Sequence, residues 1–116
     1  MDIYHIWCNL KPGVHDIEFV EGARASLEGL RKEGRIHSYR VMRCKLGFRP
    51  PQLREFHLTI EFDDMTQMQS AFDLVSSRTD PMESLHHVVN AKVQDAFFAL
   101  YRDFPDATRV RGEEKF

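Results

Sequence analysis

Apolar and polar residues alternate strictly along residues 54–62, a pattern that predicts a β-strand. Every second residue shares a face, because side chains of a strand point alternately to its two sides. One face is apolar and consists of Phe56, Leu58, Ile60 and Phe62. The other carries groups that bind protons or form hydrogen bonds: Glu55, His57, Thr59 and Glu61. The apolar face must pack against a hydrophobic core. The polar face can form a binding site only if another part of the protein covers it.

Residues 2–10 also alternate and are rich in aromatic and β-branched types, so they predict another strand. One side of this strand carries Tyr4, Ile6, Cys8 and Leu10. The other side carries Ile3, His5, Trp7 and Asn9. Because the second set includes the only tryptophan, it too calls for a cover. Pro12 and Gly13 end the strand.

From Asp16 the period changes to steps of three and four, which predicts an amphipathic helix ending near Gly34. Its apolar stripe is Ile17, Val20, Ala23, Leu27 and Leu30. Asp16 is the predicted N-terminal cap, and Gly34 suits a left-handed residue after the last turn.

Residues 35–46 predict a strand with imperfect alternation, since Tyr39 and Val41 compete for the apolar face with four other residues: Ile36, Met42, Cys44 and Leu46. A bulge or burial on both faces would resolve the conflict. The loop at residues 47–51 then joins this strand to residues 54–62 as a hairpin.

A second helix is predicted after Asp63 and Asp64, with Gln67 in capping-box position and an apolar stripe of Met65, Met68, Phe72 and Val75. A fresh start at Asp80 and Pro81 predicts a further helix to about Gln94. Residues 96–102 predict a last strand, buried on both faces. We expect one domain over residues 1–106 and a flexible tail over residues 107–116.

This order of elements predicts an α+β fold, a ferredoxin-like βαββ(αα)β sandwich with a four-stranded antiparallel sheet in the order 4-1-3-2. The predicted helices then form a single layer that covers one face of the sheet. The other face collects an unusually apolar and aromatic set of residues: Ile3, His5, Trp7, Asn9, His57, Thr59, Phe97, Ala99 and Tyr101. A surface this apolar is unfavourable in water, so we expect another protein surface to cover it, and a second copy of the same sheet is the simplest candidate.

Three segments carry a resemblance to a known family: residues 4–7 (Tyr-His-Ile-Trp), 55–61 (Glu-Phe-His-Leu-Thr-Ile-Glu) and 98–105 (Phe-Ala-Leu-Tyr-Arg-Asp-Phe-Pro). Over residues 1–106 the chain resembles a small uncharacterised bacterial family of the dimeric α+β barrel superfamily. That superfamily includes antibiotic-biosynthesis-type monooxygenases, EthD-like proteins, muconolactone isomerases and haem-handling enzymes. The resemblance implies a homodimer whose two sheets enclose a cavity, and it does not fix a reaction.

The candidate catalytic residues are His57, Glu61 and His5, with a histidine as proton carrier and the carboxylate as orienting group or base. The strand pairing is expected to bring His5 near Thr59 or Glu61, and His57 near Trp7. The expected ligand-binding lining is Trp7, Asn9, Thr59, Phe97 and Tyr101. The alternative interpretation is that both histidines only satisfy hydrogen bonds inside a dimer interface.

A metal site is a weaker hypothesis, because His86 and His87 diverge on a helix and only His5, His57 and Glu61 offer a two-histidine, one-carboxylate set. No haem or flavin signature is present, so we expect neither metal nor cofactor. Arg40, Arg43 and Lys45 offer a cationic rim for a carboxylate ligand, although simple strand alternation beside solvent also explains them.

The 116 residues carry 16 basic and 18 acidic side chains, and the net charge of -2 disfavours nucleic acid or a membrane as partner. Cys8 and Cys44 lack redox or zinc spacing and predict buried thiols. With no leader-like pattern at residues 1–5, we expect a cytoplasmic protein. The predicted function is binding of a small, partly apolar molecule, with catalysis as a cofactor-independent isomerase, lyase or monooxygenase. The alternative is a non-enzymatic ligand-binding or structural dimer.

Overall fold

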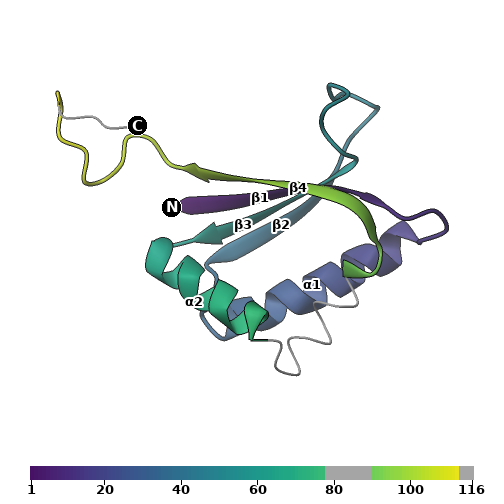
Figure 1. Ribbon diagram of the computed structural model, residues 1–116, viewed down its shortest axis with the longest axis horizontal. Helices are drawn as coiled ribbons and strands as arrows, with labels where there is room; N and C mark the ends of the chain where they lie inside the picture. Colours follow the sequence, from purple (N-terminus) through teal and green to yellow (C-terminus); the bar gives the residue numbers. More distant parts are fainter. Residues whose placement is uncertain (78–89, 113–116) are drawn as a thin grey trace.

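The computed structural model describes residues 1–77 and 90–112 (Figure 1). The elements in chain order are β1 Asp2–Leu10, α1 Asp16–Lys32, β2 Ser38–Arg43, β3 Phe56–Phe62, α2 Met65–Ser76 and β4 Val93–Arg102. The strands form one antiparallel sheet in the order β2-β3-β1-β4, which is the predicted order 4-1-3-2 read from the opposite edge. Within the described ranges, no helix is long and apolar enough to cross a membrane.

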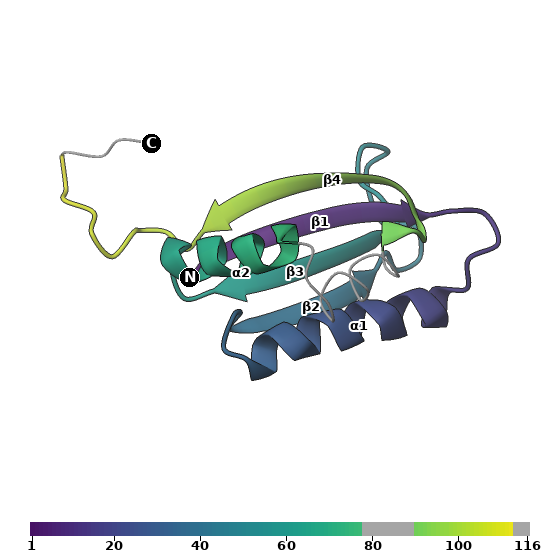
Figure 2. The same cartoon turned by 60° about the horizontal axis from the view of Figure 1, so that its bottom comes forward.

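Both helices pack on the same side of the sheet (Figures 1 and 2). The core between them and the sheet is built from the apolar sides of the strands, as the alternation predicts. Its largest fully buried side chains are Phe19, Phe56, Phe62 and Cys8. Within the part of the chain that the structure describes, no helix covers the opposite side of the sheet, which we call the open face.

The apolar stripe of α1 is displaced from the predicted one. Ile17 is 64% exposed, whereas Phe19 is 1% exposed and packs edge-on against Phe56. Residues 17 and 19 lie about 200° apart around a helix, so only one of them can face the sheet. The prediction was also wrong about the cap, because His15 is the N-cap and Asp16 is the first helical residue. Gly34 has the predicted left-handed conformation, with φ 71°.

Strand β2 is shorter than predicted and pairs with β3 in a regular register from Ser38 to Arg43. The predicted bulge or double burial was therefore wrong. Ile36 is buried before the strand begins, and Cys44 follows its last residue. Tyr39 and Val41 pack against the core. Of the residues that competed with them, Met42 lies within β2 on the opposite face of the sheet, and the others lie outside the strand.

Helix α2 is capped as predicted. The Asp64 side chain accepts a hydrogen bond of 2.8 Å from the Gln67 backbone N–H. The Gln67 side-chain oxygen accepts one of 2.6 Å from the Asp63 backbone N–H. The first bond satisfies a donor that a helix start leaves without a partner, and the second links the first turn to the residue before the cap.

The helix predicted from Asp80 lies largely outside the described residues. Its predicted end at Gln94 was wrong, since β4 already begins at Val93. The prediction that β4 is buried on both faces was also wrong for the single chain. Phe98 is 57% exposed and Tyr101 is 63% exposed, because β4 is an edge strand that the described helices cover only in part. Residues 103–112 form neither helix nor strand and run away from the sheet (Figure 1).

Candidate functional site on the open face

The open face carries side chains in rows that cross the sheet, because paired strands place one residue of each strand side by side. The central row, from β2 to β4, is Met42, His57, Trp7 and Phe97. The second row is Arg40, Thr59, His5 and Ala99. The third row is Ser38, Glu61, Ile3 and Tyr101. The predicted neighbours of His5 and His57, which are Thr59 and Trp7, are confirmed.

The two histidines contact each other directly. His5 Nδ1 and His57 Nε2 lie 2.9 Å apart, within hydrogen-bond distance. One imidazole must donate and the other accept, so two fully protonated rings would break the bond. The bond therefore requires that at least one of the two rings be neutral.

Aromatic rings pack around this histidine pair. Trp7 stacks on His57 with ring centroids 4.4 Å apart and on His5 with centroids 5.3 Å apart. Phe97 stacks on the other side of Trp7 at 5.4 Å, and Tyr101 meets His5 edge-on at 5.1 Å. We call these five residues the aromatic cluster. The cluster joins the two central strands to β4 and gives the open face a flat apolar wall beside two proton-binding groups.

Burial sets the protonation of the pair. Desolvation lowers the pKa of His5 below its ordinary value. The pKa of His57 is also lowered, first by desolvation and then by repulsion from a charged His5. Both shifts favour neutral imidazoles near neutral pH, the form that accepts a proton from a bound molecule.

Glu61 lies one row away from Thr59 and is engaged elsewhere. Its carboxylate accepts a hydrogen bond of 2.6 Å from the Ser38 hydroxyl, which links β3 to β2. Among the described residues, no three His, Cys, Asp or Glu side chains gather closely enough to hold a metal ion. The structure thus brings His5 and His57 together without adding Glu61 as a third ligand.

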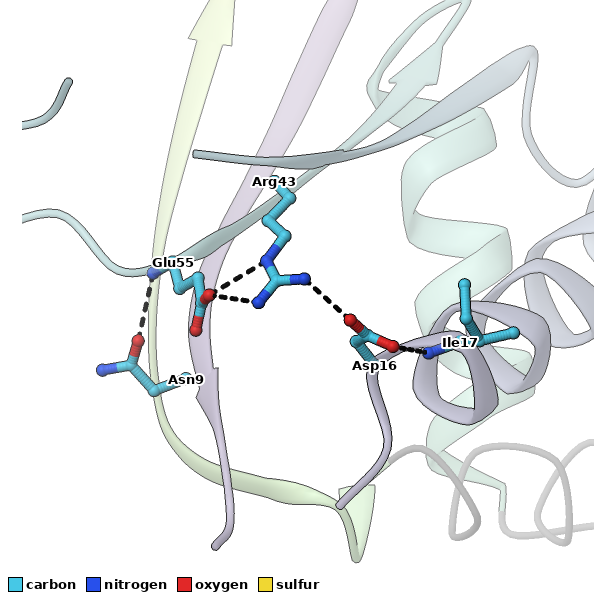
Figure 3. Close-up of polar contacts among 5 residues, drawn as sticks. All are labelled: Asn9, Asp16, Ile17, Arg43 and Glu55. Atoms are coloured by element: carbon cyan, nitrogen blue, oxygen red, sulfur yellow. Dashed lines mark hydrogen bonds and ion pairs between the residues drawn. The ribbon is translucent and has the colours of Figure 1, made fainter. Parts of the chain in front are cut away.

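Asn9 is held at one end of the open face by one backbone N–H and one carboxylate. Its side-chain oxygen accepts a hydrogen bond of 3.0 Å from the Glu55 N–H (Figure 3). Its backbone N–H donates to the Asp95 carboxylate at 3.3 Å. The same figure shows Arg43 joining Glu55 to Asp16 at the start of α1. Asn9 therefore connects the end of β1 to Glu55 and Asp95. Arg43 connects the end of β2 to Glu55 and to the start of α1. These ion pairs explain Arg43 without a cationic rim, which the sequence left as an alternative to simple strand alternation.

Thr59 and Met42 complete the inner part of the face. Thr59 is 9% exposed and lies between Arg40 and His5 in the second row. Met42 lies beside His57, a position that the sequence did not identify because the alternation of residues 35–46 was ambiguous. A shallow depression elsewhere, along α2, is lined by residues such as Arg35 and Ser70 and lies away from the histidines.

Residues 1–116 match the model of a family described as a family of unknown function (DUF6614). The chain belongs to this family. No curated protein matches the chain. Membership covers every element described above, and the family description assigns no activity to its members.

Solved structures with this fold cover most of the chain. The At3g17210 protein of Arabidopsis thaliana has a TM-score of 0.72 at 7% identity, covering 95% of this chain and 100% of its own. A dimeric protein of unknown function and ferredoxin-like fold from Bacteroides fragilis gives 0.56 at 16%, covering 88% and 96%. A putative antibiotic biosynthesis monooxygenase from Nitrosomonas europaea gives 0.65 at 12%, covering 90% and 99%. The predicted ferredoxin-like fold is confirmed.

Proposed function

We propose that the protein is a homodimer whose two open faces enclose a cavity for a small, partly apolar molecule. The observation that carries this proposal is the aromatic cluster, which lies on a sheet face that no described helix covers. Contiguous apolar surface of this kind marks binding or assembly sites in soluble proteins. The similar Bacteroides fragilis protein, which is dimeric, supports a second copy as the cover.

Within the cavity, the histidine pair is proposed as the proton carrier. A neutral His57 accepts a proton from a bound molecule, and His5 stabilises the resulting imidazolium through their hydrogen bond. Trp7, Phe97 and Tyr101 form the apolar wall, and Thr59 offers a hydroxyl. Asn9 and Glu61 border the cavity and position backbone and neighbouring side chains.

This chemistry suits an isomerase, a lyase or a cofactor-independent monooxygenase acting in the cytoplasm. Each of these classes includes reactions that begin with removal or relocation of a proton, which a neutral imidazole can perform. The monooxygenase class draws support from the putative enzyme of Nitrosomonas europaea that shares the fold.

A second candidate is a non-enzymatic ligand-binding or structural dimer. The observation that favours it is that His5 and His57 already share a hydrogen bond in the single chain, which gives one nitrogen of each ring a partner without any ligand. A His57→Gln variant separates the two functions once a turned-over molecule is identified. An enzyme loses turnover with ligand affinity largely kept, whereas a binding protein has no turnover to lose.

Native mass spectrometry of freshly purified protein tests the proposal. We expect a dimer that carries a retained small molecule, and we expect His57→Ala to lose that molecule while staying dimeric. His15→Ala is the matched control, because His15 is an exposed histidine at the start of α1. A compact monomer in solution would contradict a cavity formed by two sheets.

A further inference from the structure

Arg40 belongs to the edge strand β2, and its side chain lies on the open face of the sheet. Its neighbours Tyr39 and Val41 pack toward the core, and the Tyr39 hydroxyl donates a hydrogen bond of 3.0 Å to Glu28 of α1. Because side chains alternate along a strand, Arg40 points away from the helices. It pairs across the strands with Thr59, whose other neighbour in the row is His5.

The guanidinium of Arg40 differs from that of Arg43 on the same strand. Arg43 binds the carboxylates of Asp16 and Glu55, each at 2.7 Å. Among the described residues, Arg40 has no ion pair or hydrogen bond of its side chain, and it is exposed. Glu61, its diagonal neighbour, bonds to Ser38 instead.

The hydroxyl of Thr59 is in a similar position. Thr59 is 9% exposed, yet within the described ranges its hydroxyl has no hydrogen-bond partner. Among the described residues, every fully buried side-chain oxygen or nitrogen has a hydrogen-bond partner. The unpaired Thr59 hydroxyl is therefore not fully buried and can be reached from the open face. A cation and a hydroxyl donor thus stand side by side with their bonding capacity unused.

This arrangement has the chemistry of a carboxylate site. The planar guanidinium presents paired N–H donors that match the two oxygens of a carboxylate, and a hydroxyl adds a third donor. Neighbouring strands lie about 4.8 Å apart, so His5 is about two strand spacings from Arg40 and Trp7 lies in the next row. An acid anchored at Arg40 would extend its carbon skeleton over the histidine pair toward Trp7 and Phe97.

We propose that Arg40 and Thr59 bind the carboxylate of a small aromatic or otherwise apolar monocarboxylic acid, and that its apolar part rests on the aromatic cluster. The inference rests on the proposed cavity between two open faces and names the class of molecule that enters it. It places the carbon atoms next to the carboxylate beside the imidazoles of His5 and His57, where a proton can be exchanged.

Trp7 supplies the measurement, since it is the only tryptophan of the chain and stacks on His57. Benzoate and benzamide are the probes, because they share size and ring and differ in charge. We expect benzoate to change Trp7 emission saturably with a Kd at or below about 1 mM, and benzamide to bind at least about tenfold more weakly. Phenylacetate and phenylacetamide repeat the comparison with a longer acid.

Arg40→Gln is the decisive variant, and Arg24→Gln is its matched control on the exposed side of α1. Arg40→Gln should weaken benzoate binding by about tenfold to a hundredfold and leave benzamide binding unchanged. Arg24→Gln should change neither. Sedimentation velocity on the same samples reports whether each variant keeps the mass of the wild-type protein.

Equal affinity for acid and amide, or wild-type benzoate affinity in Arg40→Gln, would overturn the carboxylate site and leave the cavity standing. A dimer that binds neither probe pair would also overturn it. A monomeric wild-type protein would instead overturn the proposed function itself. Loss of dimer mass in Arg40→Gln alone would assign the guanidinium to a contact between subunits and so refute the carboxylate role.

Discussion

His5 and His57 are hydrogen-bonded at 2.9 Å although they are not paired directly across β1 and β3. His5 is opposite Thr59, and His57 is opposite Trp7, so the two imidazoles are diagonal neighbours. Diagonal positions of an antiparallel pair are within reach of long or aromatic side chains. Each imidazole therefore responds to the proton state of the other, and replacing one ring leaves the second without its partner.

The lowered pKa values of His5 and His57 predict that stability falls in weak acid. The unfolded chain binds protons near the ordinary histidine pKa of 6.5, while the folded chain binds them only at lower pH. This contribution to the free energy of unfolding is complete above pH 6.5 and is lost as the pH falls through the folded-state values. Urea unfolding from pH 7.5 to pH 5, at fixed protein concentration, should show the loss.

His57→Gln should flatten this pH dependence, and His15→Gln should leave it unchanged. His15 is exposed at the start of α1 and lies outside the aromatic cluster. An equally steep loss of stability in His57→Gln would mean that other groups dominate the acid response.

Tyr101 offers a direct test of the covered face. The residue is 63% exposed in the single chain, so a carboxylate there is solvated in a monomer but desolvated in a dimer formed through the open faces. Tyr101→Glu should raise the dimer dissociation constant at least about tenfold, as measured by sedimentation equilibrium. Ile17→Glu, at 64% exposure on α1, is the control and should leave the constant unchanged.

The buried stripe of α1 predicts unequal costs for two truncations. Phe19→Ala removes a ring that is 1% exposed and should lower the free energy of unfolding by about 3–5 kcal/mol. Ile17→Ala removes a largely exposed side chain and should cost less than about 0.5 kcal/mol. Chemical denaturation measures both, and a reversed order would contradict the helix orientation.

The carboxyl group of Glu28 should be unusually acidic. Its hydrogen bonds from Arg31 and then Tyr39 lower its pKa from 4.5 to about 2. NMR titration of the side-chain carboxyl carbon should show this value in the wild-type protein. Arg31→Gln should raise the pKa most and Tyr39→Phe by a smaller step, and a wild-type midpoint near 4.5 would exclude both hydrogen bonds in solution.

The two cysteines should react at very different rates. Cys8 is 1% exposed, and burial, aided by the nearby Asp95, raises the pKa of its thiol to about 11. Because the thiolate is the reactive form, Cys8 should resist a thiol reagent at pH 8 while the half-buried Cys44 is labelled. Ellman's reagent should therefore titrate one thiol in the native protein and two in guanidinium chloride. Cys44→Ser should abolish the native reaction, and persistent labelling of that variant would place Cys8 at the surface.

The strands and helices were predicted correctly where the hydrophobic periodicity and the capping residues indicated the same element. Residues 55–62 alternate without exception, and Asp64 with Gln67 marked the start of α2. The errors occurred where local pattern left the orientation open. Both Ile17 and Phe19 are apolar residues near the helix start, and only packing against Phe56 selects Phe19. Likewise, the limits of β2 depend on pairing with β3, which the composition of residues 35–46 does not encode.

The sequence predicted which residues of the candidate site share a face of the sheet, but not which side chains contact each other. Strand order and alternation place His5, His57 and Trp7 on one face, and the register confirms their neighbours. The hydrogen bond between the histidines depends on how the side chains lean across the rows. The attachment of Asn9 to Glu55, and of Glu61 to Ser38, likewise depends on side-chain geometry.

The alternation along β1 (nine residues) and β3 (seven residues) assigns the two faces of each strand to different roles. Positions that face the helices hold the hydrophobic core, and the intervening positions hold the aromatic cluster. A library that randomises only the open-face positions would leave the core sequence intact, so the chemistry of this face can be varied without changing the residues that pack against the helices. The open face can therefore be engineered independently of the core that holds the fold.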